Sequence, residues 1–594
     1  KAKKSKKSKK TWRTYDGTCN NKKDPELGST LGFYSRGEEG AQVWEDTSGE
    51  FHELNPRTIS NALGEQLTDT PKDENGENMI TVLFGQFVNH DLERNAVIDE
   101  FEQIFDFIYF DTNDPICFVP IGGGRPLTES RCPDPASVRF RQSAGTLIDD
   151  EFEVRNEATS YLDLDSVYGR DDTVVDILRE GEGGRLKEET YSGTAFRFLP
   201  YSIEKLPPSR GTTGLPADTL HLRQPDDQIP SAGDNRVANN VSLFLFHTLF
   251  LREHNRIALQ ISESNPEMDD ETLFQEARRL NIAQYQNIVL YEYLTSLLGP
   301  YFEEVVGQYD KYDKKIDPTT SILFATVAYR FGHSALSGYA PRDECGDIST
   351  LVLPPFLPPG SNLPSLGQAG GPFTPPIQVV IANGFENIIR GLILTQTNRV
   401  DLQYVDEIRQ IPVSTGVIDI FALDIMRGRI NQVPNYARLV MALGDDRGIY
   451  SSPDCPSSLK TDLNQTDPVS CFIKITAKDI ENPTDEEQQS AEDLLGAFGK
   501  VLHVDSIIGL LAEAHMPGIS FGKSLLILIA DQFKRSRDGD RFWFENGKQF
   551  SENQLMEIKS TSMKDLFVRN FDIEILPENV FANGDLLNST ITSC

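Results

Sequence analysis

Two of the eight histidines in this 594-residue chain lie where their side chains could do chemistry. His90 follows an apolar run and comes four residues after Gln86, so both side chains share one face of a helix. His333 follows Arg330 on a second apolar segment, and Arg236 stands among small polar residues between the two. One histidine can ligate a metal, another can accept and return a proton, and an arginine can stabilise developing negative charge. Taken singly, each residue is more often structural, so only their combination indicates a reactive site.

A second group of residues offers oxygen ligands. Thr159, Asp163 and Asp165 alternate at short spacing in one loop, and Tyr161 between them can add its backbone carbonyl. Calcium takes carboxylate and carbonyl oxygens of this kind. Asp91 would complete such a site and hold the loop to the helix that carries the first histidine. Judged alone, the loop is more typical of a solvated acidic turn.

Apolar periodicity predicts a mainly α-helical chain that positions these residues. Ile80, Leu83, Phe84 and Phe87 predict a helix ending near Glu93. Strand signals are few and short. The two histidine segments are far apart in sequence, so one site that uses both favours a single large helical domain over residues 13–594. Further helices are predicted at 237–262, 271–298, 319–336, 384–396, 417–426, 486–498, 504–515 and 521–534, and Pro/Gly-rich surface loops at 111–135 and 353–376.

The charge balance excludes some partners. The chain carries 57 Lys and Arg against 90 Asp and Glu, a formal net charge of −33, so its surface repels nucleic acid. Seven lysines in the first ten residues predict a basic, disordered tail over residues 1–12, or the end of a cleaved pro-segment. Contact of this tail with an acidic polymer or a membrane surface is the alternative. No apolar run reaches about 18 residues, so no transmembrane helix is predicted.

Cysteine usage favours an oxidising compartment. Cys117 and Cys132 flank a Gly/Pro-rich loop, and Cys455 and Cys471 bracket a polar one. These spacings predict two local disulfides, which are typical of secreted proteins. Glycosylation sequons also suit a secreted glycoprotein, and they begin at Asn240, Asn464 and Asn588. The first sequon opens an apolar helix and is expected to be unused.

Several motifs in a fixed order give the chain a family resemblance. They lie at residues 14–21, 251–256, 435–438, 531–543 and 576–581, and the second reads Leu251-Arg-Glu-His-Asn-Arg256. With the histidine segments, they make the chain resemble the animal-type haem peroxidases of the peroxidase–cyclooxygenase superfamily, and among these the peroxinectin and peroxidasin members. The resemblance covers nearly the whole chain and implies a helical haem-peroxidase domain with few short strands.

The resemblance also implies a role for each candidate residue. His90 would be the distal histidine that moves the peroxide proton, with Gln86 and Arg236 beside it. His333 would be the proximal ligand of haem b iron. The calcium ligands implied by the resemblance are Asp91, Thr159, Tyr161, Asp163 and Asp165.

Two departures from the family pattern change what is expected of the haem. Many members form two haem esters through carboxylates at the positions of Asn89 and Asn239, and an amide cannot form those esters. We therefore expect non-covalent haem. The family usually places asparagine at Asp424 as the partner of the proximal histidine, and a carboxylate would accept the imidazole N–H more strongly and lower the iron potential.

Three functions are compatible with these residues. The first is a secreted peroxidase that reduces hydrogen peroxide and oxidises a small donor, such as a phenol or iodide, through a ferryl intermediate. The second is a haem-bearing extracellular-matrix or adhesion protein with weak turnover, which the missing ester carboxylates favour. The third is a fatty-acid dioxygenase, but those enzymes place a radical tyrosine where this chain has Arg330, and Tyr329 comes one residue too early. An odd cysteine, such as Cys594, could be free or link a homodimer.

Overall fold

The fold is taken from a computed structural model of the chain. It describes residues 12–36, 54–65, 70–95, 105–110, 114, 130, 136–141, 145–148, 151–190, 197–200, 230–344, 347–352, 380–381, 384–413, 416–443, 494, 498, 503–547, 549–573 and 576–581. Several predicted features lie wholly or almost wholly outside these ranges. They are the lysine-rich segment, the two predicted loops, the predicted helix at 486–498 and the cysteines other than Cys19. Both predicted disulfides therefore stay predictions.

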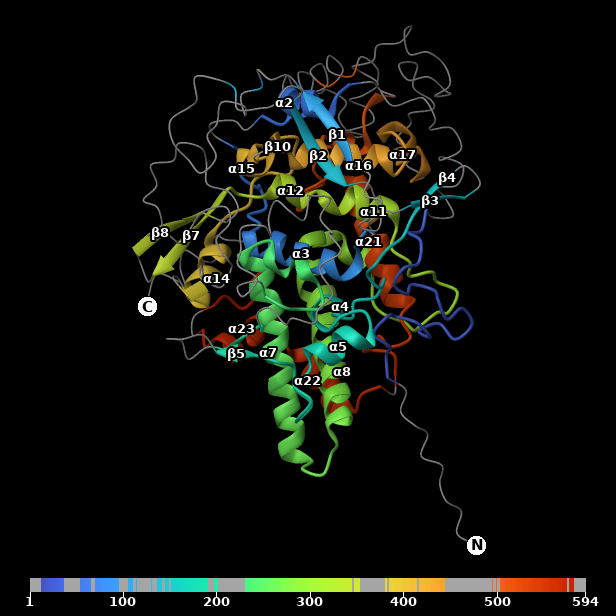
Figure 1. The fold of residues 1–594 in the computed structure, drawn as a ribbon, viewed down its shortest axis with the longest axis vertical. Helices are drawn as coiled ribbons and strands as arrows, with labels where there is room; N and C mark the ends of the chain where they lie inside the picture. The colour runs from blue at the N-terminus through green and yellow to red at the C-terminus, as the bar shows by residue number, and fades with distance from the viewer. Residues whose placement is uncertain are drawn as a thin grey trace.

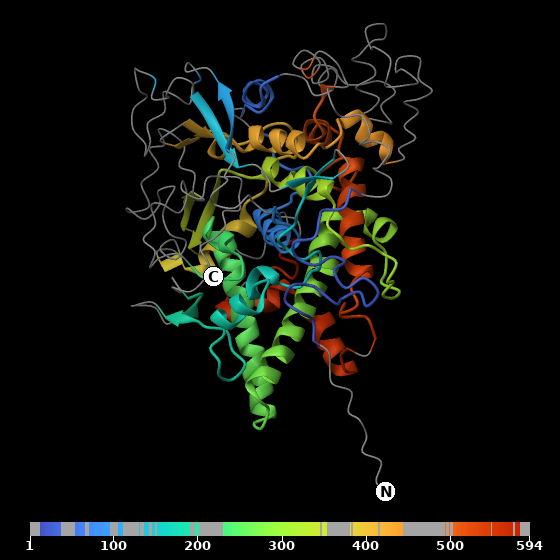
Figure 2. The same cartoon turned by 45° about the vertical axis from the view of Figure 1, so that its right-hand side comes forward.

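The helix that carries His90 forms as predicted. It is α3, Met79–Leu92, and the side chain of Asn78 caps its first turn by accepting from the Thr81 N–H. In both views it lies near the middle of the molecule (Figures 1 and 2). Its Phe87 ring stacks on Phe250 of the next long helix with centroids 5.4 Å apart. Burial of each such ring stabilises the fold by about 1.5–3 kcal/mol.

Two long helices form a hairpin against α3. The first is α7, Val241–Ser264, which follows the short helix η3, Asn235–Ala238. The second is α8, Asp270–Ile288, which continues through the π-helical turn η4, Val289–Tyr293, into α9, Leu294–Leu298. Both were predicted, although η3 and η4 divide what the sequence indicated as continuous helices. Figure 1 shows the hairpin projecting away from the rest of the fold.

The segment of His333 does not form the single helix predicted at 319–336. It divides into α11, Ile322–Thr326, the 3₁₀ turn η6, Ala328–Arg330, and α12, Gly332–Ala335. The break falls at Val327, whose backbone leaves the helical region with φ −130°. Gly332 then allows a close approach to α3, because a Cβ there would lie 3.3 Å from Val82 Cγ1. Tertiary packing overrides the apolar periodicity at this point.

The layer that covers α12 contains α16, Ile420–Ile430. The helix was predicted at 417–426, but strand β10, Gly416–Ile418, occupies the residues before Ile420. Figures 1 and 2 show α16 on the side of α12 away from the hairpin. The other helices are α2 Pro56–Leu63, α4 Asp165–Tyr168, α5 Asp172–Leu178, η5 Gly299–Tyr301, α10 Phe302–Val305, α14 Phe385–Leu394, α15 Asp406–Arg409, α17 Tyr436–Ala442, α20 Ser506–Leu511, α21 Lys523–Asp538, α22 Glu552–Ser560 and α23 Met563–Phe571.

Strands are short and peripheral. One four-stranded sheet has the order β1-β2-β10-β9, and the other strands pair as the hairpins β3–β4, β5–β6 and β7–β8. Their bounds are β1 Phe105–Phe110, β2 Ala136–Arg141, β3 Gly145–Ile148, β4 Glu151–Val154, β5 Glu189–Thr190, β6 Arg197–Phe198, β7 Tyr339–Glu344, β8 Asp347–Val352, β9 Ile411–Val413 and β10 Gly416–Ile418. The mainly α-helical fold class predicted from the sequence is confirmed.

One continuous apolar core joins segments from Tyr34 to Phe581. Among the described residues, no helix has both the length and the apolar character needed to cross a membrane.

Candidate active site

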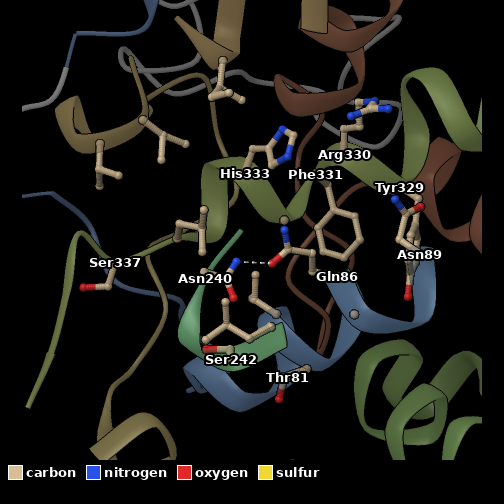
Figure 3. A pocket seen from close by; sticks show the side chains of 18 of the residues that line it. Thr81, Gln86, Asn89, Asn240, Ser242, Tyr329, Arg330, Phe331, His333 and Ser337 are labelled. Atoms are coloured by element: carbon tan, nitrogen blue, oxygen red, sulfur yellow. Dashed lines mark hydrogen bonds between the residues drawn. The ribbon is translucent and has the colours of Figure 1, made fainter. Parts of the chain in front are cut away.

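A cavity of about 210 Å³ lies between α3 and the η6–α12 segment. Much of its wall is apolar, and its polar side chains include five of the predicted site residues: Gln86, Asn89, Asn239, Arg330 and His333. Figure 3 shows that His333 and Arg330 enter from one side, whereas Gln86 belongs to α3 on the other. We call this space the central cavity.

His333 is held by a carboxylate behind it. Its Nδ1 lies 2.6 Å from Asp424 Oδ2, which leaves the other ring nitrogen for a ligand. Asp424 is fully buried on α16 and also accepts hydrogen bonds from Arg427 Nη1 at 3.1 Å and from the Tyr404 hydroxyl at 3.4 Å. Burial alone would raise the pKa of Asp424, but His333, Arg330 and Arg427 together lower it. The carboxylate is therefore ionised and fixes the orientation of the imidazole.

Gln86 is oriented by a residue that the sequence indicated only as a sequon. Its Oε1 accepts a hydrogen bond of 2.9 Å from Asn240 Nδ2 (Figure 3). The Oδ1 of Asn240 meanwhile caps α7 by accepting from the Leu243 N–H. Because the amide oxygen of Gln86 is occupied, its amide nitrogen is left to act as a donor.

His90 and Arg236 lie together behind the wall of the central cavity rather than on it. Arg236 Nη2 donates to the backbone carbonyl of His90 at 3.1 Å and to Asp234 at 2.7 Å. Burial lowers the pKa of His90 well below its usual value, and the charge of Arg236 lowers it further. The imidazole is therefore neutral, and its buried Nδ1 has no hydrogen-bond partner within the described ranges.

Glu93 joins the two sides of the site, and the sequence analysis missed it. It accepts from Asn89 Nδ2 at 2.7 Å, and its Oε1 lies 3.6 Å from Arg236 Nη1 and 3.9 Å from Arg330 Nη2. Its spacing of four residues from Asn89 on the α3 face is the signal that could have found it. The Oδ1 atoms of Asn89 and Asn239 are both buried without a partner in the described part of the chain.

The predicted calcium residues lie together below α3. Asp91 Oδ2 accepts from the backbone N–H groups of Asp163 at 3.1 Å and Leu164 at 3.2 Å, which ties the loop to the helix. Thr159 Oγ1 lies 3.0 Å from Asp163 Oδ1 and 3.4 Å from the Tyr161 carbonyl oxygen. Asp165 Oδ2 accepts from the Thr159 N–H at 2.8 Å, so all five predicted residues are connected by direct contacts.

This acidic group carries unsatisfied negative charge. Asp91 Oδ1 and Asp163 Oδ2 are buried and lack hydrogen-bond partners within the described residues. Burial raises the pKa values of Asp91, Asp163 and Asp165. Repulsion within the group raises those of Asp91 and Asp163 further, whereas the charge of Asp234 adds to the shift of Asp165. No three or more described His, Cys, Asp or Glu side chains form a metal-site arrangement, and both oxygens of Asp165 are held by Arg170. Calcium also takes hydroxyl and carbonyl oxygens, so the donor set suits calcium better than a transition metal.

The two remaining buried histidines of α7 are structural. His247 Nδ1 bonds to the Leu243 carbonyl at 2.7 Å, and its ring lies edge-on to Phe87. His254 bonds to the Tyr168 hydroxyl and the Gly184 carbonyl, both at 2.9 Å. Burial lowers their pKa values to about 4 and about 3, respectively.

Comparisons with known proteins agree with this geometry. The family model described as animal haem peroxidase matches residues 12–448 and 470–581. The chain belongs to the animal haem peroxidase family. The human peroxidasin homolog is 29% identical over 94% of this chain, and peroxinectin A of Dictyostelium discoideum is 27% identical over 96% of this chain and 95% of its own length. Peroxidase A of the same organism has a solved structure that superposes with a TM-score of 0.74 at 25% identity, covering 96% of this chain and all of that chain.

The chain spans only 36% of the length of the human peroxidasin homolog. The family implies haem, and the central cavity of this animal haem peroxidase fits the group on chemical grounds. One wall offers an imidazole backed by a carboxylate, most of the wall is apolar, and Arg330 Nε has no hydrogen-bond partner within the described ranges. A cation of this kind suits the carboxylates at the edge of a haem.

Tyr329, one residue before the position of a dioxygenase radical tyrosine, contacts a second tyrosine. Its hydroxyl lies 2.8 Å from that of Tyr293, and both tyrosines line the central cavity. The residue three before His333 is Arg330, which contacts Glu93 and Asp424 at 3.9 Å. The position of a dioxygenase tyrosine is therefore filled by an arginine in an ion-pair network.

Proposed function

We propose that this chain is a haem peroxidase that reduces hydrogen peroxide and oxidises a small donor such as a phenol or iodide. The observation that carries the proposal is the pairing of His333 Nδ1 with Asp424 at 2.6 Å, across the central cavity from α3. An iron-ligating histidine characteristically gives its other N–H to a carboxylate or carbonyl.

His333 would hold the iron of haem b through its free ring nitrogen, and Arg330 would pair with a haem carboxylate. When bound, the haem supplies the electrons that reduce peroxide. Asp424 keeps the imidazole in one tautomer and orientation. Asn89 and Asn239 cannot form esters, so the haem is held without covalent bonds, and acid acetone should extract all of it; haem that stays with the denatured chain would contradict this.

His90 supplies the proton transfer. Because His90 lies behind the cavity wall, its neutral imidazole would take the proton from hydrogen peroxide through one water and return it to the leaving oxygen, which departs as water. Arg236 is anchored to the His90 carbonyl, so its positive charge stays beside the histidine as negative charge develops. Gln86 offers its amide N–H groups to a water or halide in the cavity.

A secreted, calcium-binding glycoprotein is the form that we propose. Asp91, Thr159, Tyr161 and Asp163 would hold calcium, and Asp165 would join them if it shared its bonds with Arg170. The cysteine spacings and the sequons at Asn464 and Asn588 support an oxidising compartment. The side chain of Asn240 is engaged by Gln86 and Leu243, which supports the expectation that this sequon is unused.

The test is the absorption spectrum of the purified protein, followed by peroxide and a phenolic donor. We expect a Soret band that shifts on peroxide, and donor oxidation that His90→Ala lowers by about 10²- to 10⁴-fold. His503→Ala is the matched control, because His503 contacts the Phe498 carbonyl and belongs neither to α3 nor to the wall of the central cavity. A Soret band without turnover would favour the haem-bearing matrix protein instead. No Soret band after haem reconstitution would refute both.

A further inference from the structure

A second cavity, of about 490 Å³, lies between the N-terminal segment, α8 and residues 541–550. Its wall carries five cationic side chains, those of Arg13, Lys22, Arg278, Arg279 and Arg541, and no Asp or Glu is among its lining residues, all of which are described. In a chain with a net charge of −33, such a wall is unusual. We call this space the basic cavity.

Two buried arginines on this wall have donors that the fold does not use. Arg278 is 3% exposed, and its terminal nitrogens donate to the carbonyls of Arg13 and Thr14, but its Nε has no partner among the described residues. Arg13 is 8% exposed and bonds to Asp540 through Nη2. Its Nη1 has no hydrogen-bond partner in the described ranges and lies 3.7 Å from Asp163. A buried donor without a partner costs about 1–3 kcal/mol.

The positive charge of the wall is only partly neutralised. Arg279 pairs with Glu276 at 2.5 Å. The donors of Arg278 and Arg541 go to backbone carbonyls, which satisfy hydrogen bonds without cancelling charge. Burial lowers the pKa of Arg278, and the charge of Arg13 lowers it further. An anion in the cavity would relieve this repulsion.

The chemistry of the wall selects one kind of ligand. Planar guanidinium groups match the oxygens of phosphate and sulfate, which they bind in pairs. Asn546 adds an amide group, and the rings of Phe542 and Phe550 lie under Arg541 and Arg279 at 4.1 and 4.2 Å. The volume falls within the range of about 300–1,000 Å³ that is usual for small-molecule sites.

We propose that the basic cavity binds a phosphate- or sulfate-bearing molecule about the size of a monosaccharide. The site shares no lining residue with the central cavity, so ligand binding there is separate from peroxide reduction. If the basic cavity binds no such ligand, the proposed peroxidase function still stands. If the chain is not a peroxidase, the ligand proposal still stands.

The experiment is calorimetric titration of the haem-loaded full chain at constant ionic strength, balanced with chloride. The probes are inorganic phosphate, inorganic sulfate, glucose 6-phosphate and glucose 6-sulfate. We expect one equivalent of ligand to bind. Either the two phosphate probes or the two sulfate probes should bind more tightly, and this comparison identifies the anionic group that the cavity prefers. Arg278→Gln should weaken binding by roughly tenfold or more, since a charge-assisted hydrogen bond is lost.

Arg278 also holds the N-terminal segment, so its substitution could change the fold as well as the cavity. A second variant, at a residue without this structural role, keeps the test decisive. Lys22→Gln should weaken binding by roughly two- to fivefold, as expected for an exposed charge. Lys23→Gln makes the same charge change at the neighbouring residue, which is exposed and does not line the cavity, and it should have no effect on binding. Removal of residues 1–11 should also leave binding unchanged. No saturable binding, equal losses in both lysine variants, or loss on removal of residues 1–11 would overturn the proposal.

Discussion

In the proposed haem site, the side chain behind the His333 imidazole decides how much negative character that imidazole has. Asp424 is buried and ionised, and its Oδ2 lies 2.6 Å from His333 Nδ1. Asp424→Asn replaces this acceptor with a neutral one, so haem iron should be easier to reduce. We expect the Fe(III)/Fe(II) potential to rise by on the order of 60 mV, a tenfold change in a one-electron equilibrium. Spectroelectrochemical titration measures it.

Tyr404→Phe is the control for that substitution. It removes only the long 3.4 Å hydrogen bond to the same carboxylate and leaves the charge in place. Its effect on the potential should be much smaller. An unchanged potential in Asp424→Asn would show that the carboxylate only supports the fold.

Asn240 holds Gln86 and caps α7 with different atoms, so the two roles can be separated. Asn240→Ser keeps a capping oxygen but lacks the amide donor, so stability should stay within a few tenths of a kcal/mol while peroxidase kcat/KM falls by roughly fivefold. Asn240→Ala should lose the same activity and about 1 kcal/mol of stability as well. Steady-state kinetics and chemical unfolding measure the two effects. Equal activity in wild type and both variants would show that Asn240 does not position Gln86.

At the scale of elements, α3 can approach the η4 turn because residue 85 is glycine. A Cβ at Gly85 would lie 2.6 Å from the Tyr293 hydroxyl, well inside contact distance. Gly→Ala in a helix normally stabilises by about 1 kcal/mol, but overpacking here should reverse the sign and cost about 1–3 kcal/mol. Thermal unfolding of Gly85→Ala checks this.

Tyr293→Phe removes the atom that the new Cβ would meet. In the double variant, Gly85→Ala should therefore cost at least 1 kcal/mol less than it does alone, a coupling typical of residues in contact. Additive effects of the two substitutions would contradict the close approach.

The same elements show what the sequence could and could not predict. The periodicity of Ile80 and Phe87 located the end of α3 to within a residue, because the apolar side chains of that helix are buried in the core. Periodicity failed at Val327, where tertiary packing breaks an apolar segment that local propensity would keep helical.

The candidate residues were predictable by type, and their partners were not. The sequence named His333 and Asp424, but nothing in a sequence places Arg236 under the His90 carbonyl or directs Asn240 towards Gln86. Such contacts depend on how helices from distant parts of the chain meet. Glu93 could have been predicted, because it lies one helical turn from Asn89. Its role nevertheless depends on Arg236 and Arg330, which the sequence does not place beside it.

At the scale of the molecule, the acidic group below α3 links separate parts of the chain. Asp91 belongs to α3, and Asp163 belongs to the loop that precedes α4. Arg13 of the N-terminal segment lies 3.7 Å from Asp163. A cation bound among these residues would stabilise all three segments at once, since binding free energy adds to the stability of the folded state.

The pH dependence of this stabilisation has a definite sign. Without calcium, burial raises the pKa values of Asp91, Asp163 and Asp165, and repulsion within the group adds to the shifts of Asp91 and Asp163, so the folded chain binds more protons than the unfolded chain. That stability is present below the ordinary aspartate pKa of about 3.9 and is lost as pH rises through the raised values. Calcium needs the deprotonated carboxylates, so its stabilising effect should grow with pH.

We therefore expect calcium at a hundredfold excess over its dissociation constant to stabilise the chain by about 2.7 kcal/mol near pH 8, relative to a chelator, and by much less near pH 5. Thermal unfolding in calcium and in chelator at both pH values measures this. Asp163→Asn should abolish most of the difference. Asp171→Asn should preserve it, because Asp171 caps α5 outside the acidic group and asparagine caps equally well. A difference that is independent of pH, or that survives in Asp163→Asn, would mean that calcium acts elsewhere on this acidic chain.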